Sequence, residues 1–193
     1  MITVGVLDLQ GAVTEHVDKL NKIEWVIALR IKNVEDLNKV QGIILPGGES
    51  TAIGTLLRDF RIVDTLREKI KGGLPVWGTC AGMILLAKKI EGYDFNYIGT
   101  MNVEVKRNAY GAQVESFMVD EIVVGVSDIK IPMVFIRAPY VKRLLGDVEV
   151  LSEVNGNIVA CRENNMLATS FHPELSQDLT MHRYFCKMCS EYV

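Results

Sequence analysis

The sequence lacks an excess of positive charge and a long apolar run. Its 193 residues contain 21 lysines and arginines against 24 aspartates and glutamates, for a net charge of −3. Nucleic-acid binding relies on clustered basic side chains, so we expect no nucleic-acid partner. No apolar run reaches the roughly 18 residues of a membrane-spanning helix, and residues 1–5 lack the basic start of a signal peptide. We therefore expect a cytoplasmic protein that does not contact a membrane.

Cysteine is also scarce. Cys80, Cys161, Cys186 and Cys189 are too few for a disulfide framework, and a 193-residue chain needs no such staple. Cys186 and Cys189, with His182 nearby, provide three metal ligands where structural zinc needs four. Cysteines three apart on an amphipathic helix are more typical of core-facing small hydrophobes. We expect no metal and no cofactor.

The first half of the chain alternates between strand-like and helix-period segments. Strand-like runs at 2–7, 25–29, 42–45 and 74–78 are followed by helix-period segments at 13–22, 34–40, 50–59, 62–71 and 82–89. This alternation predicts a parallel sheet covered by helices on both faces. The second half is richer in strands, at 103–106, 114–118, 134–137, 148–154, 157–162 and 166–171, before a terminal helix at 179–192. We predict one α/β domain over residues 1–193, three-layered and flavodoxin-like, with a mostly parallel central sheet and an additional antiparallel strand region.

Cys80 lies at a predicted junction of a strand and a helix, in Gly78-Thr79-Cys80-Ala81-Gly82. Small residues two places on either side are typical of a nucleophile elbow, whose tight turn exposes the central side chain. A cysteine at a helix N-terminus is favoured as thiolate. The Ala81 amide would then face a developing oxyanion. A buried cysteine in a glycine-rich turn remains the alternative, and the motif alone does not decide.

A second glycine turn, Pro46-Gly47-Gly48-Glu49-Ser50, follows another buried strand. Both turns are expected at the same sheet edge, so that Gly48 would supply the second oxyanion amide. The alternative is a plain turn in which Ser50 caps the next helix.

His172 is the strongest candidate for a base among three histidines. It follows the last buried strand in His172-Pro173-Glu174, so that Glu174 is close enough to orient the imidazole. Arg107 and Arg137 each follow a strand-like run and are candidates to bind a carboxylate, although from the residues alone ordinary surface ion pairing is the favoured interpretation.

Together, these residues resemble the class I (triad) glutamine amidotransferases. Residues 78–82 match that family's nucleophile motif, and residues 172–174 match its base and carboxylate. Residues 5–7, 9–12, 15–16, 45–51, 107–108, 113, 116–117 and 135–139 resemble the glutaminase subunits of pyridoxal 5′-phosphate synthase more specifically. The resemblance covers essentially the whole chain.

The resemblance implies that glutamine is hydrolysed to glutamate and ammonia through a thioester on Cys80, with His172 and Glu174 completing the triad. It also implies that L-glutamine is bound by Gly47, Gly48, Glu49, Arg107, Ile136 and Arg137. The ammonia would pass to a separate synthase subunit in a hetero-oligomeric ring complex that makes pyridoxal 5′-phosphate. His16 and its helix would lie near the contact with that partner, which favours an interface role over catalysis.

Two residues depart from this pattern, and two other enzyme readings remain open. Asp8 stands where the family more often has glycine, and Ala112 where an arginine is usual. A class I glutaminase serving another synthase is one alternative, and a flavodoxin-like cysteine hydrolase is the other. The latter group typically has histidine directly after the cysteine, where this chain has Ala81. A non-catalytic scaffold that keeps the elbow for packing is a third possibility.

Overall fold

The computed structural model describes residues 1–108 and 116–192. The described strands, in chain order, are β1 (Ile2–Leu7), β2 (Val26–Ile31), β3 (Gly42–Leu45), β4 (Val76–Thr79), β5 (Ala87–Ile90), β6 (Met101–Lys106), β7 (Ser116–Val123), β8 (Ser127–Ile136), β9 (Tyr140–Leu144), β10 (Glu149–Val154), β11 (Asn157–Glu163) and β12 (Met166–Thr169). The described helices are α1 (Val13–Leu20), α2 (Val34–Leu37), α3 (Ser50–Asp59), α4 (Val63–Lys71), α5 (Ala81–Leu86), the 3₁₀ turn η1 (Pro173–Leu175) and α6 (Thr180–Ser190).

The central sheet is parallel where the chain alternates between strands and helices. Its first five strands have the order β2-β1-β3-β4-β12, and each neighbouring pair is parallel. This is the flavodoxin-like order, with β12 as the fifth strand. Beyond β12, strands β11 and β9 are antiparallel additions, and β10 pairs with β11. The predicted fold class is therefore confirmed.

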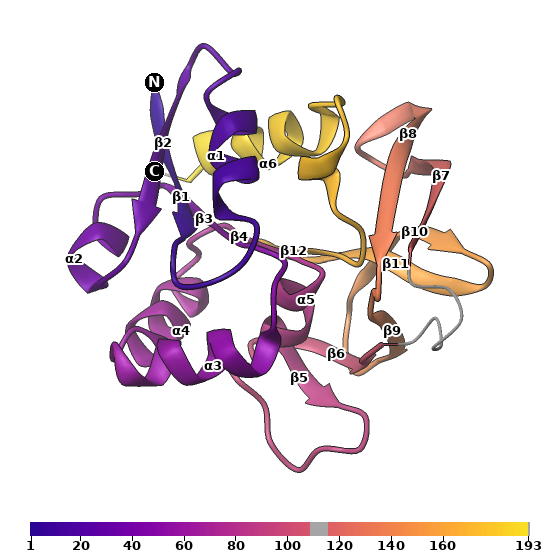
Figure 1. The fold of residues 1–193 in the computed structure, drawn as a ribbon, viewed down its shortest axis with the longest axis horizontal. Coiled ribbons are helices and arrows are strands. Elements are labelled where there is room, and N and C mark those ends of the chain that lie inside the picture. Colours follow the sequence, from indigo (N-terminus) through magenta and orange to yellow (C-terminus); the bar gives the residue numbers. More distant parts are fainter. Residues whose placement is uncertain (109–115, 193) are drawn as a thin grey trace.

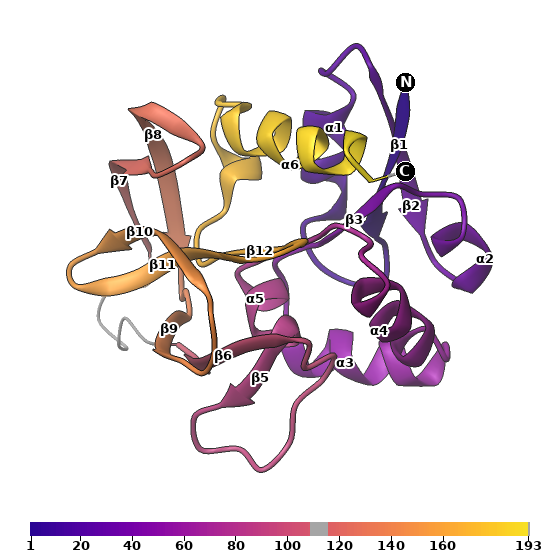
Figure 2. The same ribbon diagram turned by 180° about the vertical axis from the view of Figure 1, so that it is seen from behind.

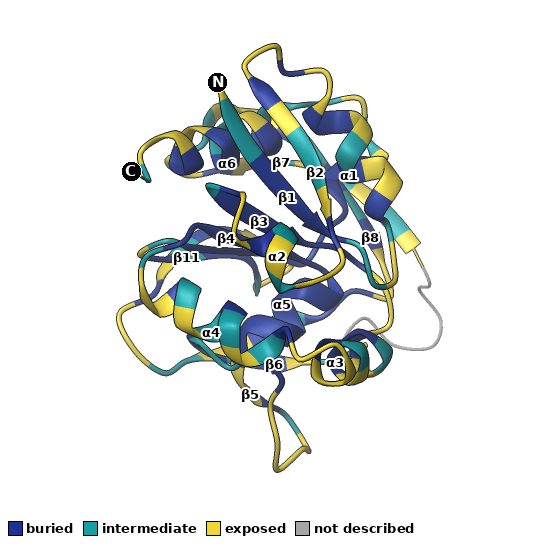
Figure 3. Ribbon diagram, turned by 90° about the vertical axis from the view of Figure 1, so that its left-hand side faces the viewer, coloured by how far each residue is buried: buried dark blue, intermediate teal, exposed yellow. Residues whose placement is uncertain are grey.

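Two hydrophobic cores lie on opposite faces of this sheet, which makes three layers (Figures 1 and 2). Successive side chains of a strand point to opposite faces, so Ile43 and Leu45 join one core while Ile44 joins the other. Helices α1 and α6 cover the face that contains Ile44, and α3, α4 and α5 cover the other. Figure 3 shows the resulting pattern: β3 is buried throughout, β1 is intermediate at its start and buried beyond it, and the helices have exposed outer faces.

Strands β7 and β8 form a separate two-stranded antiparallel sheet beside the end of the α6 layer (Figure 2). The rings of Phe117 and Phe135 stack at 4.6 Å, and Phe135 meets Phe171 edge-on at 5.9 Å. The backbone amide of His172 donates to the carbonyl of Val134 in β8 at 2.8 Å. The small sheet is thus attached to the segment that carries the predicted base.

The structure differs from the predicted elements in the region after Cys80. The helix predicted over 82–89 ends at Leu86, and residues 87–90 form strand β5. Ala87 has an extended backbone and pairs with Met101 of β6, so sheet pairing overrides the helical pattern. Strand β9 is not among the predicted elements. Ala112, Gln113 and Val114 lie outside the described residues. None of the described helices is long and apolar enough to cross a membrane.

Candidate active site

Cys80 occupies a sharp turn between β4 and α5. Its φ of 48° and ψ of −102° lie in a conformation that side-chain-bearing residues rarely adopt. A Cβ on Gly78 would lie 2.4 Å from the Gly82 carbonyl, and one on Gly82 would lie 2.1 Å from the carbonyl oxygen of Leu45. Both flanking positions therefore require glycine, because the turn brings backbone against backbone. This is the geometry of the predicted nucleophile elbow.

Burial separates Cys80 chemically from the other three cysteines. The side chains of Cys161, Cys186 and Cys189 are fully buried in the two cores. Burial raises the thiol pKa of Cys161 and of Cys186 to about 12, and it raises the pKa of Cys189 as well. The prediction that Cys186 and Cys189 face the core is confirmed. Cys80, by contrast, is 8% exposed and lines a cavity.

His172 and Glu174 lie next to this turn, at the end of the segment that follows β12. The Nδ1 of His172 is 2.7 Å from Oε1 of Glu174, whose carboxylate is fully buried. Pro173 begins the short η1 turn, which places the two side chains on the same side. Because Thr79 of β4 pairs with Thr169 of β12, the strand ends that precede Cys80 and His172 lie side by side.

The pKa values of this pair are shifted in opposite directions. Burial alone would lower the pKa of His172, but hydrogen bonds to Cys80 and Glu174 raise it to about 10. Burial alone would raise the pKa of Glu174, but the neighbouring His16 and His172 lower it below its usual value. At neutral pH the imidazole is therefore protonated between a sulfur on one side and a carboxylate on the other.

The Pro46-Gly47-Gly48 turn packs directly on His172. A Cβ on Gly47 would lie 2.4 Å from Cε1 of His172 and 3.5 Å from Cβ of Cys80. The Gly47 carbonyl accepts a hydrogen bond from the amide of Ala12 at 2.9 Å, which ties the turn to the segment after β1. The two glycine turns therefore meet at the carboxyl end of the sheet, as predicted from their positions after buried strands.

The helix after this turn is capped by Glu49, which corrects the proposed capping role of Ser50. The Glu49 carboxylate accepts from the amide of Ala52 at 2.8 Å, whereas Ser50 is the first helical residue. The Ser50 hydroxyl is buried and has no hydrogen-bond partner among the described residues, although the residue lines the cavity. Because the Glu49 side chain, one residue before Ser50, already binds the amide of Ala52 at the third helical position, the Ser50 hydroxyl is left available to a ligand.

A cavity of about 440 Å³ opens in front of Cys80. Its lining consists of Gln10, Gly48, Glu49, Ser50, Cys80, Ala81, Ile84, Arg107, Asn108, Ile136, Arg137, Pro139 and His172. Two of the predicted site residues, Gly47 and Glu174, are not on this lining. Both lie against His172 instead. All the others lie around one cavity, whose volume suits a small ligand.

Three of the predicted ligand-binding residues surround the mouth of this cavity. Arg107 donates to Glu49 Oε1 at 3.1 Å and to the Tyr93 hydroxyl at 3.3 Å, and its guanidinium lies 5.3 Å from the Tyr93 ring centroid. The carbonyl of Ile136 is 4.0 Å from the sulfur of Cys80. Arg137 follows with a φ of 43°, a left-handed turn at the end of β8.

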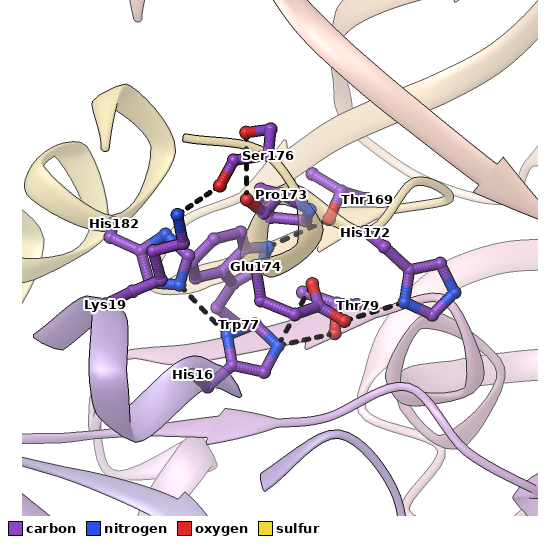
Figure 4. A network of polar contacts seen from close by, with 10 residues as sticks. All are labelled: His16, Lys19, Trp77, Thr79, Thr169, His172, Pro173, Glu174, Ser176 and His182. Atoms are coloured by element: carbon purple, nitrogen blue, oxygen red, sulfur yellow. Dashed lines mark hydrogen bonds and ion pairs between the residues drawn. The ribbon is translucent and has the colours of Figure 1, made fainter. Parts of the chain in front are cut away.

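A buried polar network lies next to Glu174 and His172 (Figure 4). His16 of α1 has no exposed surface, and its Nε2 lies 3.4 Å from Glu174 Oε2 and 3.2 Å from the Thr79 hydroxyl. Its Nδ1 is 3.0 Å from Nε2 of His182 on α6. The predicted interface role of His16 is therefore wrong for its side chain, which faces the carboxylate of the candidate triad. Sequence spacing places α1 on the sheet but does not show which way this histidine points.

Comparisons with known proteins agree with one another. The SNO glutamine amidotransferase family matches residues 6–191. The chain is 57% identical over 185 residues to the pyridoxal 5′-phosphate synthase subunit PdxT of Clostridium botulinum (strain Loch Maree / Type A3), covering 96% of both chains. It is 53% identical to the corresponding subunit of Ruminiclostridium cellulolyticum, covering 97% of this chain and all of that one. The chain belongs to the SNO glutamine amidotransferase family.

Solved structures agree with this assignment at the level of the fold. A crystal structure of a glutamine amidotransferase is 43% identical, covers 97% of this chain and 98% of its own, and superposes with a TM-score of 0.92. A chain in the structure of PurLQS from Thermotoga maritima superposes with a TM-score of 0.70 at 18% identity, which concerns the fold alone.

The site residues predicted from the sequence did not include three polar residues that the structure places at the site. Gln10 and Ser50 line the cavity, and His16 faces Glu174. Gln10 accepts the Glu49 amide at 2.9 Å through its side chain and so holds the glycine turn. Its position in the segment that follows β1, at the carboxyl edge of the sheet, is the signal that could have identified it. Asp8, one of the two departures from the family pattern, forms ion pairs of 3.5 Å with Arg30 and Lys32.

Proposed function

We propose that this chain is a glutaminase, which hydrolyses L-glutamine to glutamate and ammonia through a thioester on Cys80. One observation carries the proposal. A cysteine on a strained strand-to-helix turn faces a cavity, and a histidine beside it is held by a buried carboxylate at 2.7 Å. This is the arrangement of nucleophile, base and orienting group that acyl transfer requires.

The first step forms a bond between the Cys80 sulfur and the carboxamide carbon of glutamine. His172 would take the thiol proton, and its raised pKa reflects its contacts with Cys80 and Glu174. As sulfur attacks, the electron pair of the C=O bond moves to oxygen, and amide groups of Gly48 and Ala81 would stabilise that negative charge.

The second step releases ammonia. The oxyanion re-forms the C=O bond, the C–N bond breaks, and the nitrogen leaves with the proton of the His172 imidazolium. The resulting neutral His172 then removes a proton from water, and the hydroxyl adds to the thioester carbon. Collapse of this second intermediate breaks the C–S bond, returning the thiolate and the imidazolium and releasing glutamate. Glu174 keeps Nδ1 of His172 protonated throughout, so that Nε2 remains the nitrogen that exchanges protons.

The cavity provides groups that suit an amino-acid substrate. Arg107 and Arg137 would bind the α-carboxylate, because guanidinium groups form strong, directional hydrogen bonds with carboxylates. Glu49 would accept from the α-ammonium group. Gly48 and Ile136 would contact the extended side chain of glutamine, whereas Gly47, predicted as a binding residue but absent from the cavity lining, would support His172 instead.

The ammonia would be used by a second protein. The relatives are named as subunits of pyridoxal 5′-phosphate synthase, and residues 1–193 would form one amidotransferase domain. We therefore propose a cytoplasmic hetero-oligomeric ring complex in which this chain supplies ammonia to a separate synthase subunit.

Labelling tests the nucleophile directly. A glutamine-mimicking alkylating agent is added to the chain together with its synthase, and the labelled peptides are mapped by mass. We expect label on Cys80 and none on Cys161, Cys186 or Cys189, whose raised pKa values make them internal controls. Cys80→Ala should fold and bind the synthase but release no glutamate. Absence of label on Cys80 in the complex would refute the proposal.

A further inference from the structure

We propose that His16 is a positioning residue of the triad, which holds the second carboxylate oxygen of Glu174 through its Nε2–H. Glu174 would then be fixed between two imidazoles, with Oε1 toward His172 and Oε2 toward His16. His16 does not contact the reacting atoms. The inference rests on the glutaminase function proposed above.

The two oxygens of Glu174 have unequal surroundings. Oε1 lies 2.7 Å from Nδ1 of His172. Oε2 is buried and makes no hydrogen bond with the other described residues, and His16 Nε2 faces it at 3.4 Å. A buried carboxylate oxygen without a donor is costly, so a modest closing of this distance in the working complex would be favoured. His16 is the side chain placed to provide the donor.

The tautomer of His16 follows from its partners. Burial lowers the pKa of both His16 and His182 to about 3, so each ring is neutral and carries one proton. The ionised carboxylate of Glu174 can only accept, which favours the proton of His16 on Nε2. Nδ1 of His16 must then accept from Nε2–H of His182, 3.0 Å away. The remaining nitrogen of His182, Nδ1, has no partner among the described residues, and it is an unprotonated acceptor in this arrangement, so no N–H is left orphaned.

The network also connects Glu174 to the nucleophile's own strand. The Thr79 hydroxyl, directly before Cys80, lies 3.2 Å from the same Nε2 of His16. The Trp77 ring packs edge-on at 5.8 Å from the His16 centroid and 5.0 Å from that of His182. Figure 4 shows these side chains, with dashed lines for the polar contacts of His16 to Thr79, Glu174 and His182. Together with the Trp77 ring, they restrict His16 and leave its Nε2 directed at Thr79 and Glu174.

Lys19 is the nearest cation on the same helix, and its ammonium group donates to the carbonyl of Ser176. It does not replace His16, because no contact joins Lys19 to the Glu174 carboxylate among the described hydrogen bonds and ion pairs. The titratable and charged groups that face Glu174 are therefore His172 from its own segment and His16 from α1, with His182, Lys19 and Cys80 beyond them.

Two amide substitutions of similar size separate positioning from packing. In His16→Gln the terminal amide nitrogen reaches the place of Nε2 and can still donate to Glu174. In His16→Asn the shorter side chain reaches only the place of Nδ1. We expect His16→Asn to lower kcat about tenfold or more with little change in KM, since a hydrogen bond to a charged group is lost. We expect His16→Gln to restore most of that loss.

The pH profile gives a second readout. Without a donor on Oε2, the pKa of Glu174 rises, so the acidic limb of kcat/KM moves to higher pH in His16→Asn and less so in His16→Gln. Leu20→Ala, which removes fully buried side-chain volume from the same helix, is the control for destabilisation. It should lower the unfolding temperature without moving the pH limb.

All variants are assayed with the synthase present, by glutamate release and by alkylation of Cys80 with iodoacetamide, which needs no glutamine. Slower alkylation of Cys80 at neutral pH in His16→Asn than in His16→Gln would support the contact between His16 and Glu174. If the wild-type chain releases no glutamate, that result refutes only the glutaminase function, and the alkylation rates still test the contact. Equal kcat, pH limb and alkylation rate in the Asn and Gln variants, or the same shift in Leu20→Ala, would overturn the inference.

Discussion

Replacing Gly47 by alanine tests the geometry of the site without changing any reactive group. Gly47 does not have a left-handed φ, so its backbone conformation is open to alanine. The added Cβ would lie 2.4 Å from Cε1 and 3.0 Å from Nδ1 of His172, whereas ordinary contact begins at 3.4 Å. The imidazole or the glycine turn must therefore move by about 1 Å.

A displacement of this size has a calculable consequence. The His172 ring is held by the 2.7 Å contact with Glu174 on one side and by Cys80 on the other, so it cannot yield without loosening one of them. A misplacement of about 1 Å in a catalytic group costs on the order of 100-fold in rate. That loss corresponds to about 2.7 kcal/mol of transition-state stabilisation. If the turn moves instead, the Gly48 amide leaves its proposed position, and the direction of the effect is the same.

The assay is glutamate release in the presence of the synthase, with kcat and KM measured separately. Gly72→Ala is the control, because Gly72 ends α4 with an ordinary φ of −76° and its nearest contact to a new Cβ is 3.3 Å. We expect a loss of about 100-fold in kcat for Gly47→Ala and wild-type activity for Gly72→Ala. Full activity of Gly47→Ala, with the protein folded, would refute the proposed packing of the turn on the base.

Three further substitutions test separate contacts. Glu174→Gln removes the carboxylate that helps raise the pKa of His172, so alkylation of the nucleophile at neutral pH should slow and kcat should fall by roughly 10⁴-fold, as for the equivalent change in a serine triad; unchanged alkylation would contradict this. Gly82→Ala would place a Cβ 2.1 Å from the Leu45 carbonyl oxygen, and denaturant unfolding should show a loss of about 3 kcal/mol or more. Arg107→Met should raise KM for glutamine roughly tenfold or more at nearly constant kcat, whereas a fall in kcat alone would argue against a binding role.

The parallel half of the fold is predictable because its physical signal is local. A strand buried on both faces is apolar at nearly every position, as in β1 and β3, and a glycine-bearing turn after each marks the carboxyl edge. The positions of Cys80 and of the glycine turn follow from that pattern, and the structure brings both to one cavity.

The remainder depends on contacts between distant segments. Ala87 to Ile90 continues an apolar helical pattern, yet it forms an edge strand because β6 offers a partner that no local rule specifies. Tyr140–Leu144 has no clear alternation of burial and becomes β9 through pairing with β6 and β11. The direction of His16 depends on Glu174 and His182, which lie far along the chain, so its place behind the triad is decided by tertiary packing alone.

The position of β12 has a consequence for how the protein is made. This strand lies in the middle of the sheet, between β4 and β11, but it is the last strand of the chain. A growing polypeptide on the ribosome therefore presents β4 with an unpaired parallel edge until residues 166–169 have left the exit tunnel. Pairing over so long a sequence separation is slow. His172 and Cys80 come together in the same event that closes the sheet, so a nascent chain that still lacks β12 has no partly assembled site and exposes the unpaired edge of β4 to aggregation.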